Sequence, residues 1–524
     1  MSSVGIELTR VNGIGLWNSW TRNFKTPLLA LLDLFDNAID APLHGGGNES
    51  TVFPGKIHVL ADTTNDDVTG IYMINNSSAP IKDIRKILEV YASEKGKDAE
   101  SIGENGVGLK QGCATLSDMS FVLIRNDHHF SLGVIAAVLQ QEEGVYLPSF
   151  QFKTIAHSPN SPSSPSSCMD NLSQEMNHLF THTHTTVGQC ISMYGNGNMQ
   201  AGIDRLIRHF TDMTFHHQWK NEQYVFSVIL HNLKHGGQTV DEAIANSIQQ
   251  TPDNNNTQLN TNKQTDLDIY SQRANGILKE LEQELPHHYI HIPQSFTVII
   301  NRNKIHFFYW QQRLVELSEF YIKIDKKNLY TKANDWVEPK EYDLIRIFCG
   351  FDPLRLGNKD SRSTCTLHIY SRQSGRLIKY DEDARAVLRL NNSGTTFCQG
   401  LSVIVDDMQG YLPLNPTKQD IAFGEETHGE VHKNNLFAWV GAIAAFFYNH
   451  HLDRCDSRRP KSQLYENVQK QAKLINSSSV KMKCLDQGEF TRFSKLGWFR
   501  TQTLNIRVKN KHNVQQHLGK HTLK

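Results

Sequence analysis

The chain lacks any uninterrupted apolar run near the length that spans a bilayer, and it does not begin with the basic-then-apolar pattern of a secretory signal. An excess of charge of one sign is also absent, because 54 Lys and Arg balance 54 Asp and Glu among 524 residues. These absences argue against a membrane protein and against a histone-like polycation. We expect an intracellular protein that binds no membrane and has room for two or three domains.

Closely spaced ligands for a metal or disulfide framework are missing as well. The eight cysteines form no C-x-x-C pair, so we expect reduced structural residues at 113, 168, 190, 349, 365, 398, 455 and 484. The run His182-Thr183-His184 and the histidine pairs at 216–217, 287–288 and 450–451 have no acidic or cysteine partner at ligand spacing. We expect these histidines in solvent-exposed loops.

A glycine-rich stretch from Ser101 to Gly112 is the most informative feature that is present. Glycines at 103, 106 and 108 let the backbone fold tightly around an anion, and the residues that follow can start a helix whose free N–H groups point at it. No Gly-Lys-Ser/Thr closes the stretch as a Walker A loop, and Lys110-Gln111 does not suit a dinucleotide fingerprint. Taken alone, a plain turn is the simpler interpretation.

A predicted helix from Leu28 to Ala41 adds a second motif. Apolar residues at 28, 29, 32, 35 and 39 share one helical face, while Asp33, Asn37 and Asp40 recur on another. A solvated polar face explains this stripe by itself. Carboxylate, amide and carboxylate one turn apart, followed by a phosphate loop, instead indicate a base, a magnesium ligand and a nucleotide contact.

Together these motifs resemble the ATP site of the GHKL superfamily of gyrase-type, chaperone, histidine-kinase and mismatch-repair ATPases, and within it the chain looks like the MORC family. The resemblance implies ATP and Mg²⁺ as cofactors, with Asn37 as the metal ligand and Asp33 as the general base. The residues that stand at ATP-binding positions are Asn37, Asp40, Asn75, Ser93, Lys95, Gly103, Glu104, Asn105, Gly106, Val107, Gly108, Leu109 and Lys110.

The similarity to MORC proteins continues along the chain and implies its architecture. Ordered matches follow at 131–148, 228–234, 345–351, 375–379 and 416–420. In this superfamily a transducer lysine reaches the terminal phosphate, and Lys418 is the matching, second catalytic residue. The resemblance implies an α+β fold: a GHKL (Bergerat) ATP-binding α/β sandwich over 1–293, a ribosomal-protein-like transducer over 294–455, and a basic tail over 456–524.

Three positions depart from the family pattern. Asp33 stands where the superfamily has glutamate, and a base misplaced by about 1 Å can cost on the order of 100-fold in rate. The adenine-binding segment reads Asn75-Asn76-Ser77-Ser78-Ala79-Pro80, without the family's aspartate and glycines, and Val225-Phe226 replace its glycine-threonine. Asn75 can still accept from the adenine amino group. We expect slow hydrolysis, or a site that binds ATP without hydrolysing it.

Periodicity and composition predict the remaining organisation. Residues 157–173 are rich in serine, proline and asparagine, and residues 249–267 in glutamine, asparagine and threonine, so we expect flexible insertions there. The expected order is helix, strand, helix and lid, then strands to about residue 235 and a helix over 273–285. Alternating patterns predict strands at 295–301, 343–351, 365–370 and 400–406, and an apolar stripe predicts a helix over 434–449.

The C-terminal segment 481–524 differs from the neutral whole. It carries ten Lys or Arg against Asp486 and Glu489, with Phe490, Phe493, Trp498 and Phe499 interleaved. Such a tail can contact DNA without sequence preference, although a solvated end is the simpler alternative. No coiled-coil heptad is present, so any homodimer should depend on ATP and on the N-terminal arm, residues 1–16.

Two functions follow from these expectations. The first is an ATP-operated nuclear clamp of MORC type that associates with DNA and chromatin proteins, dimerises on ATP and hydrolyses it slowly, in DNA compaction or gene silencing. The second is a degenerate ATPase domain that serves as a nuclear protein-interaction scaffold. Asp33 and the Asn75 segment favour the scaffold, whereas Asn37, the glycine motif and Lys418 favour the switch.

Overall fold

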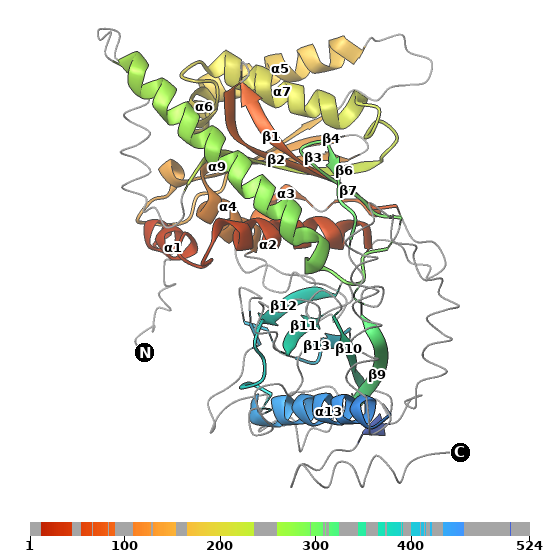
Figure 1. The fold of residues 1–524 in the computed structure, drawn as a ribbon. Coiled ribbons are helices and arrows are strands. Elements are labelled where there is room, and N and C mark those ends of the chain that lie inside the picture. Colours follow the sequence, from red (N-terminus) through yellow and green to blue (C-terminus); the bar gives the residue numbers. More distant parts are fainter. Residues whose placement is uncertain are drawn as a thin grey trace, which may run out of the picture. The chain divides into compact units, whose positions relative to one another are not determined.

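The computed structural model divides into two compact units, and each is described by itself (Figure 1). The first comprises Met1–Leu285 and Pro293–His306, and the second comprises Pro286–Ile292 and Phe307–Lys524. The structure describes residues 12–43, 54–64, 67–81, 83–89, 108–126, 129–153, 165–234, 259–293, 295–307, 310, 314–323, 344–352, 365–371, 375–388, 390, 400–408, 410–412, 414–415, 420–421, 433–454 and 503–504.

An eight-stranded sheet forms the centre of the first unit, in the order β5-β4-β3-β6-β2-β1-β7-β8. Neighbouring strands are antiparallel except β1 and β7, which are parallel. Apolar and β-branched residues favour these strands, and both faces of the central ones are buried. The strands are β1 Lys56–Thr64, β2 Asp67–Ser77, β3 Ser117–Asn126, β4 His129–Ala136, β5 Ser149–Lys153, β6 Tyr224–Leu233, β7 Thr297–Ile300 and β8 Asn303–Lys304.

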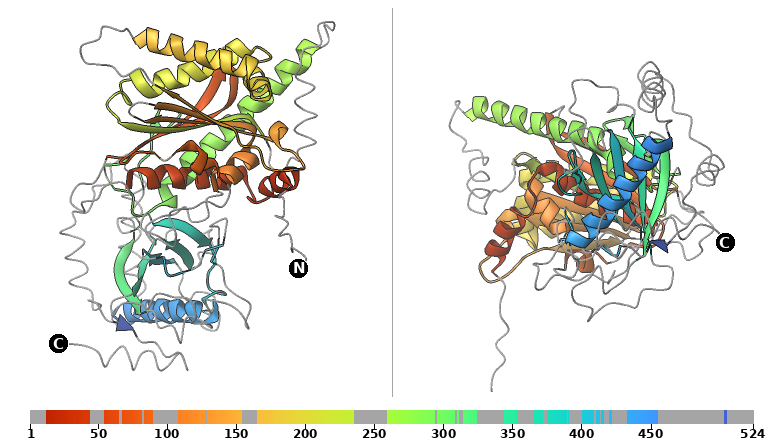
Figure 2. Two further views of the ribbon diagram at one scale, coloured as in Figure 1. Left: turned by 180° about the vertical axis from the view of Figure 1, so that it is seen from behind. Right: turned by 60° about the horizontal axis from the view of Figure 1, so that its bottom comes forward.

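Helices cover both faces of this sheet (Figures 1 and 2). One face carries α5 Pro165–His182, α6 Thr185–Tyr194 and α7 Met199–Phe215, and the core between them includes Phe130 against Phe210 at 4.9 Å between ring centroids. The other face carries α1 Gly13–Trp20, α2 Pro27–Leu43 and α4 Gly108–Leu116. The short helices α3 Ile84–Leu88 and η1 Ala137–Leu139 complete the unit, together with the long α9 Leu259–His288 up to residue Leu285.

A buried ionic cluster fastens α6 and α7 to β1. Asp62 accepts from Arg205 at 2.8 Å and from the hydroxyl of Tyr194 at 3.1 Å, and the same hydroxyl lies 2.9 Å from His209 Nε2. Burial alone would raise the pKa of Asp62, but the hydrogen bond and charge of His209 and the charge of Arg205 lower it to about 2. The carboxylate is therefore charged and paired near neutral pH.

The helical layer corrects two expectations. Residues 165–215, expected as part of a flexible insertion and then as strands, form α5, α6 and α7; Pro165 begins α5, where a missing N–H is tolerated, and Met169, Leu172 and Met176 bury one helical face. Likewise α9 begins at Leu259, so 259–267 are helical. The remaining parts of both expected insertions, 157–164 and 249–258, lie outside the described residues.

A six-stranded mixed sheet forms the second unit, in the order β12-β11-β13-β10-β9-β14, and α13 Lys433–Arg454 covers one face. The predicted strands at 343–351, 365–370 and 400–406 are confirmed as β10, β11 and β13. The predicted apolar face of α13 is confirmed too, since Leu436, Val440 and Phe447 are fully buried. The strands are β9 Val315–Lys323, β10 Leu344–Phe351, β11 Thr366–Ser371, β12 Arg376–Asp381, β13 Leu401–Asp407 and β14 Thr503–Leu504.

The protein is thus α+β with two mixed sheets. Among the described residues, no helix is long and apolar enough to cross a membrane. The expectation of exposed loop histidines is wrong for His288, which ends α9, is buried and has its pKa lowered to about 4 by burial. Of the basic tail, only Thr503–Leu504 is described, where β14 pairs with β9.

Candidate functional site

Helices α2 and α4 approach each other closely because α4 presents two glycines to α2. A Cβ atom at Gly108 would lie 2.3 Å from Asp33 Oδ2, and one at Gly112 would lie 2.8 Å from Leu34 Cδ2 and 3.2 Å from the carbonyl oxygen of Ala30. A larger residue at either position would force α2, α4 or the facing side chain of α2 to move. The spacing of four places both glycines on one face of α4.

This approach brings the predicted base to the predicted phosphate loop. Asp33 is buried on α2, and its carboxylate lies against Gly108, the first residue of α4. Free backbone N–H groups and the positive end of the helix dipole favour an anion at the start of a helix. The predicted polar stripe of α2 is therefore not a solvated face, because Asp33 and Asp40 are 2% and 1% exposed.

Asn37 lies one turn after Asp33 and is partly exposed. Its Nδ2 donates to the carbonyl oxygen of Asp33 at 3.0 Å, which leaves Oδ1 as the acceptor of the amide. An amide oxygen is a hard ligand of the kind that Mg²⁺ takes. The predicted metal ligand and the predicted base thus occupy neighbouring turns of one helix.

The end of β2 joins the same region. Hydroxyl groups of Ser77 and Ser78 donate to the carbonyl oxygen of Ala41 in α2, at 3.3 and 3.2 Å. Asn75 shares the sheet face of Ser77, since side chains alternate along a strand. It is 1% exposed, its Nδ2 donates to the carbonyl oxygen of Asn76 at 2.9 Å, and its buried Oδ1 has no hydrogen-bond partner within the described chain.

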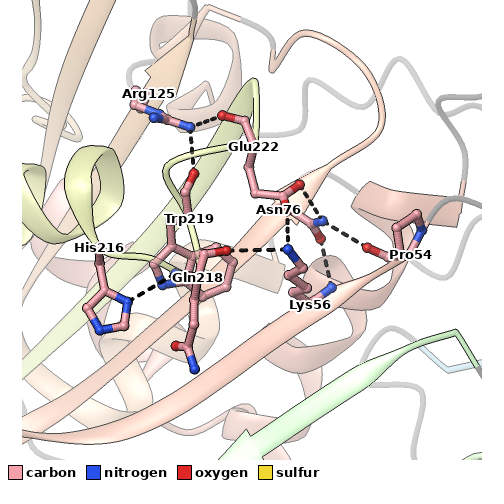
Figure 3. Close-up of polar contacts among 8 residues, drawn as sticks. All are labelled: Pro54, Lys56, Asn76, Arg125, His216, Gln218, Trp219 and Glu222. Atoms are coloured by element: carbon pink, nitrogen blue, oxygen red, sulfur yellow. Dashed lines mark hydrogen bonds and ion pairs between the residues drawn. The ribbon is translucent and has the colours of Figure 1, made fainter.

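The side chain of the neighbouring Asn76 has a structural role (Figure 3). Its Oδ1 accepts from the backbone N–H of Lys56 at 2.8 Å, and its Nδ2 donates to Pro54 O at 3.0 Å and to Glu222 Oε2 at 2.9 Å. Glu222 also pairs with the ammonium of Lys56. Both ends of the Asn76 amide are therefore used to join β1, β2 and the turn before β6, whereas the oxygen of Asn75 is left for another donor.

Lys110 holds the start of α4 to the end of α3. Its Nζ donates to the carbonyl oxygen of Glu89 at 2.8 Å, and burial lowers its pKa to about 8. Leu109 follows Gly108 in the first turn of the helix. The other predicted ATP contacts, Ser93, Lys95 and residues 103–107, lie outside the described residues.

In the second unit, Lys418 also lies outside the described residues, but the positions that flank it are described. The backbone N–H of Asn415 donates to Asp420 O at 3.0 Å, and Lys379 Nζ donates to both carboxylate oxygens of Asp420 at 3.1 Å. An ion pair therefore links the matched segments 375–379 and 416–420. Nothing in their sequence spacing predicted this contact.

The contribution of Gly112 was missed at the level of sequence. The repeat Gly108-x-x-x-Gly112 was a usable signal, because glycines four apart on a helix allow close approach of a neighbouring helix. Val225, which departs from the family pattern, is a fully buried residue of β6. Within the described ranges, no group of three or more His, Cys, Asp or Glu side chains could hold a metal ion.

Comparisons with known proteins add no assignment. No protein-family model matches the chain, and no curated protein matches it. The function is therefore argued from the residues above.

Proposed function

We propose that this protein is an ATP-binding switch of the MORC type within the GHKL superfamily, with slow ATP hydrolysis. The observation that carries the proposal is the gathering of three separate segments: Asp33 and Asn37 on α2, Asn75 at the end of β2, and Gly108 at the start of α4. The sequence resemblance assigns the base, the metal, the adenine and the phosphates to these same segments. We extend the proposal to the fold, as a Bergerat sandwich followed by a transducer.

The residues present fit the implied ligands. Asn75 offers a buried, unpartnered oxygen of the kind that accepts from the amino group of adenine. Its Nδ2 is already used in the bond to Asn76 O, so the oxygen is the group of this amide that remains to receive a hydrogen bond. The start of α4 offers N–H groups to phosphate oxygens, and Asn37 offers an oxygen to Mg²⁺, which would neutralise phosphate charge.

Hydrolysis in this proposal depends on Asp33. The carboxylate would orient and deprotonate the attacking water. The aspartate side chain is one methylene shorter than the glutamate that the superfamily has at this position. Its position against Gly108 leaves little freedom to advance toward a substrate. Slow turnover follows, with Lys418 stabilising charge on the terminal phosphate as the resemblance implies.

Nucleotide discrimination tests the proposal at Asn75. The adenine of ATP carries an amino group that can donate a hydrogen bond to Asn75 Oδ1. The base of ITP carries a carbonyl oxygen at the same position, and two acceptor oxygens repel each other. We expect the wild-type protein to bind Mg-ATP about 10-fold more tightly than Mg-ITP, and Asn75→Leu to remove this preference. Equilibrium binding measures both, with Asn275→Leu on exposed α9 as the control. An unchanged preference in Asn75→Leu would exclude Asn75 from base recognition.

We further propose a nuclear clamp that dimerises on ATP and contacts DNA through the basic tail, with chromatin proteins as partners. The support is the tail's excess of Lys and Arg, which release counterions when they neutralise phosphates. Deleting 481–524 should weaken duplex binding and lower the magnitude of its logarithmic salt slope. Equal slopes for the two chains would show a solvated tail.

A degenerate ATPase domain acting as a scaffold is the second candidate. One observation favours it: Asp33 already occupies the start of α4, where a phosphate would otherwise find backbone donors. In that case neither ATP nor its non-hydrolysable analogues would bind saturably, and the same titration separates the two candidates.

A further inference from the structure

Lys234, the residue after β6, is a fully buried cation with several contacts to α4. Its Nζ donates to the carbonyl oxygen of Ala114 at 3.1 Å and forms an ion pair with Asp118 Oδ1 at 3.1 Å. Its backbone N–H donates to Leu116 O at 2.8 Å. The side chain is 0% exposed, and a buried lysine is costly unless it is paired in this way.

These contacts satisfy the C-terminal end of α4. The last carbonyl groups of a helix have no partner within it, and a cation there interacts favourably with the helix dipole. Asp33 lies at the other end of the same helix, against Gly108. A carboxylate at the start and an ammonium at the end therefore hold α4 by two charges that complement its dipole.

Two further contacts connect this end of α4 with α1. Lys234 Nζ lies 5.2 Å from the ring centroid of Trp17, within the range of a cation–π interaction. The hydroxyl of Thr115 donates to the carbonyl oxygen of Trp20 at 3.0 Å. Both tryptophans are 1% exposed, so α1 is packed against the end of α4 and cannot follow a different course without breaking these contacts.

We propose that Lys234 is a positioning residue that transmits occupancy of the nucleotide site through α4 to α1. The proposal rests on the proposed ATP site, and it assigns a path from that site to the helix that contains residues 13–16 of the N-terminal arm. A ligand that shifts the start of α4 moves Ala114 and Thr115 with it, since a helix is stiff over this length. Lys234 and Trp17 then move together with the end of the helix.

Coupling of this kind is reciprocal, so it is measurable at both ends. A non-hydrolysable ATP analogue with Mg²⁺ is expected to slow amide hydrogen exchange in α4 and also in α1, by about fivefold or more at each. In Lys234→Met we expect the slowing at the start of α4 to persist and the slowing in α1 to disappear, and by reciprocity the analogue affinity changes by no more than about fivefold. The matched control is Lys279→Met, an exposed position of α9, which should behave as the wild type.

A double variant distinguishes loss of the path from a folding defect caused by an unpaired buried charge. Lys234→Met leaves the carboxylate of Asp118 without its cation, whereas Lys234→Met combined with Asp118→Asn removes both charges. Loss of the α1 response in either folded variant, with α4 still responding, supports the path. Equal slowing of α1 in wild type and in the folded variants would overturn it. Failure of the analogue to slow exchange in α4 of the wild-type chain would instead contradict the ATP site itself, and with it this inference.

Discussion

In the proposed site, Asp33 is the residue that determines whether bound ATP is hydrolysed. Its side chain is 2% exposed, and its carboxylate lies against the first residue of α4. A carboxylate so placed can orient a water molecule only over a narrow range of positions. In the ATP site that we propose, the chemistry of this side chain would therefore decide between slow hydrolysis and binding alone.

Asp33→Asn is expected to reduce turnover by at least about 100-fold, because the amide keeps the shape of the side chain but cannot take a proton. Binding of Mg-ATP should stay within about threefold of wild type, since the phosphates do not need the carboxylate. Steady-state phosphate release and equilibrium binding measure the two effects separately. Undiminished turnover in Asp33→Asn would remove this residue from the reaction.

Gly108 shows how one hydrogen atom in place of a side chain sets the geometry of a site. Replacement by alanine would put Cβ 2.3 Å from Asp33 Oδ2, so either α4 or Asp33 must move. We expect Gly108→Ala to lower the free energy of unfolding by about 1–3 kcal/mol. Gly276→Ala on α9 is the matched control: nothing lies within 4 Å of its Cβ, and it should be stabilising by about 0.5–1 kcal/mol.

Urea unfolding of the two glycine variants gives the comparison directly. Opposite shifts of the midpoint are expected, with Gly108→Ala lower than wild type and Gly276→Ala higher. Midpoints that shift together would show that the close approach of α2 and α4 contributes nothing to stability.

At the scale of elements, burial keeps two histidines of the first sheet uncharged near neutral pH. Burial lowers the pKa of His231 on β6 to about 3 and that of His58 on β1 to about 4, from 6.5. As the pH falls below about 6.5, these two histidines are protonated in the unfolded chain but stay neutral in the folded chain. Stability is fully present above pH 6.5 and falls as the pH drops toward 4.

His231→Phe should reduce this acid sensitivity. The ring of His231 packs edge-on against Tyr194 at 5.0 Å between centroids, and a phenyl ring keeps that contact without titrating. We expect the slope of unfolding free energy against pH between 6 and 4 to decrease by about 1.4 kcal/mol per pH unit. Equal slopes in the wild type and in His231→Phe would show that His231 takes up no proton on unfolding.

The sequence predicted an element correctly where the spacing of its apolar residues is visible within a short stretch of the chain. The helix that became α13 and strands β10, β11 and β13 carry their apolar period in a short window, so the sequence predicted them. The predictions for residues 165–215, a flexible segment followed by strands, were wrong. Serines and prolines at the start of this range obscured the helical spacing of its later apolar residues, Ile203, Leu206, Phe210 and Met213. The contact between Gly108 and Asp33 is tertiary, and no local pattern contains it.

At the scale of the whole molecule, we propose that this protein binds ATP and changes its association state when it does so. Asn37 is the residue on which the Mg²⁺-dependent part of that claim depends, because alanine at this position leaves no oxygen ligand. Association is expected to follow nucleotide binding and not protein concentration alone, since no heptad pattern provides a permanent dimer.

Light scattering during a titration of the full chain with a non-hydrolysable ATP analogue and Mg²⁺ measures whether the protein associates when it binds nucleotide. We predict saturable binding and a rise in mass from the 59.6 kDa of one chain to that of a dimer. Asn37→Ala should remain a monomer and lose the Mg²⁺-dependent affinity. A wild-type chain that binds no analogue, or that binds it at saturation and stays at 59.6 kDa, would contradict the account of an ATP-operated switch.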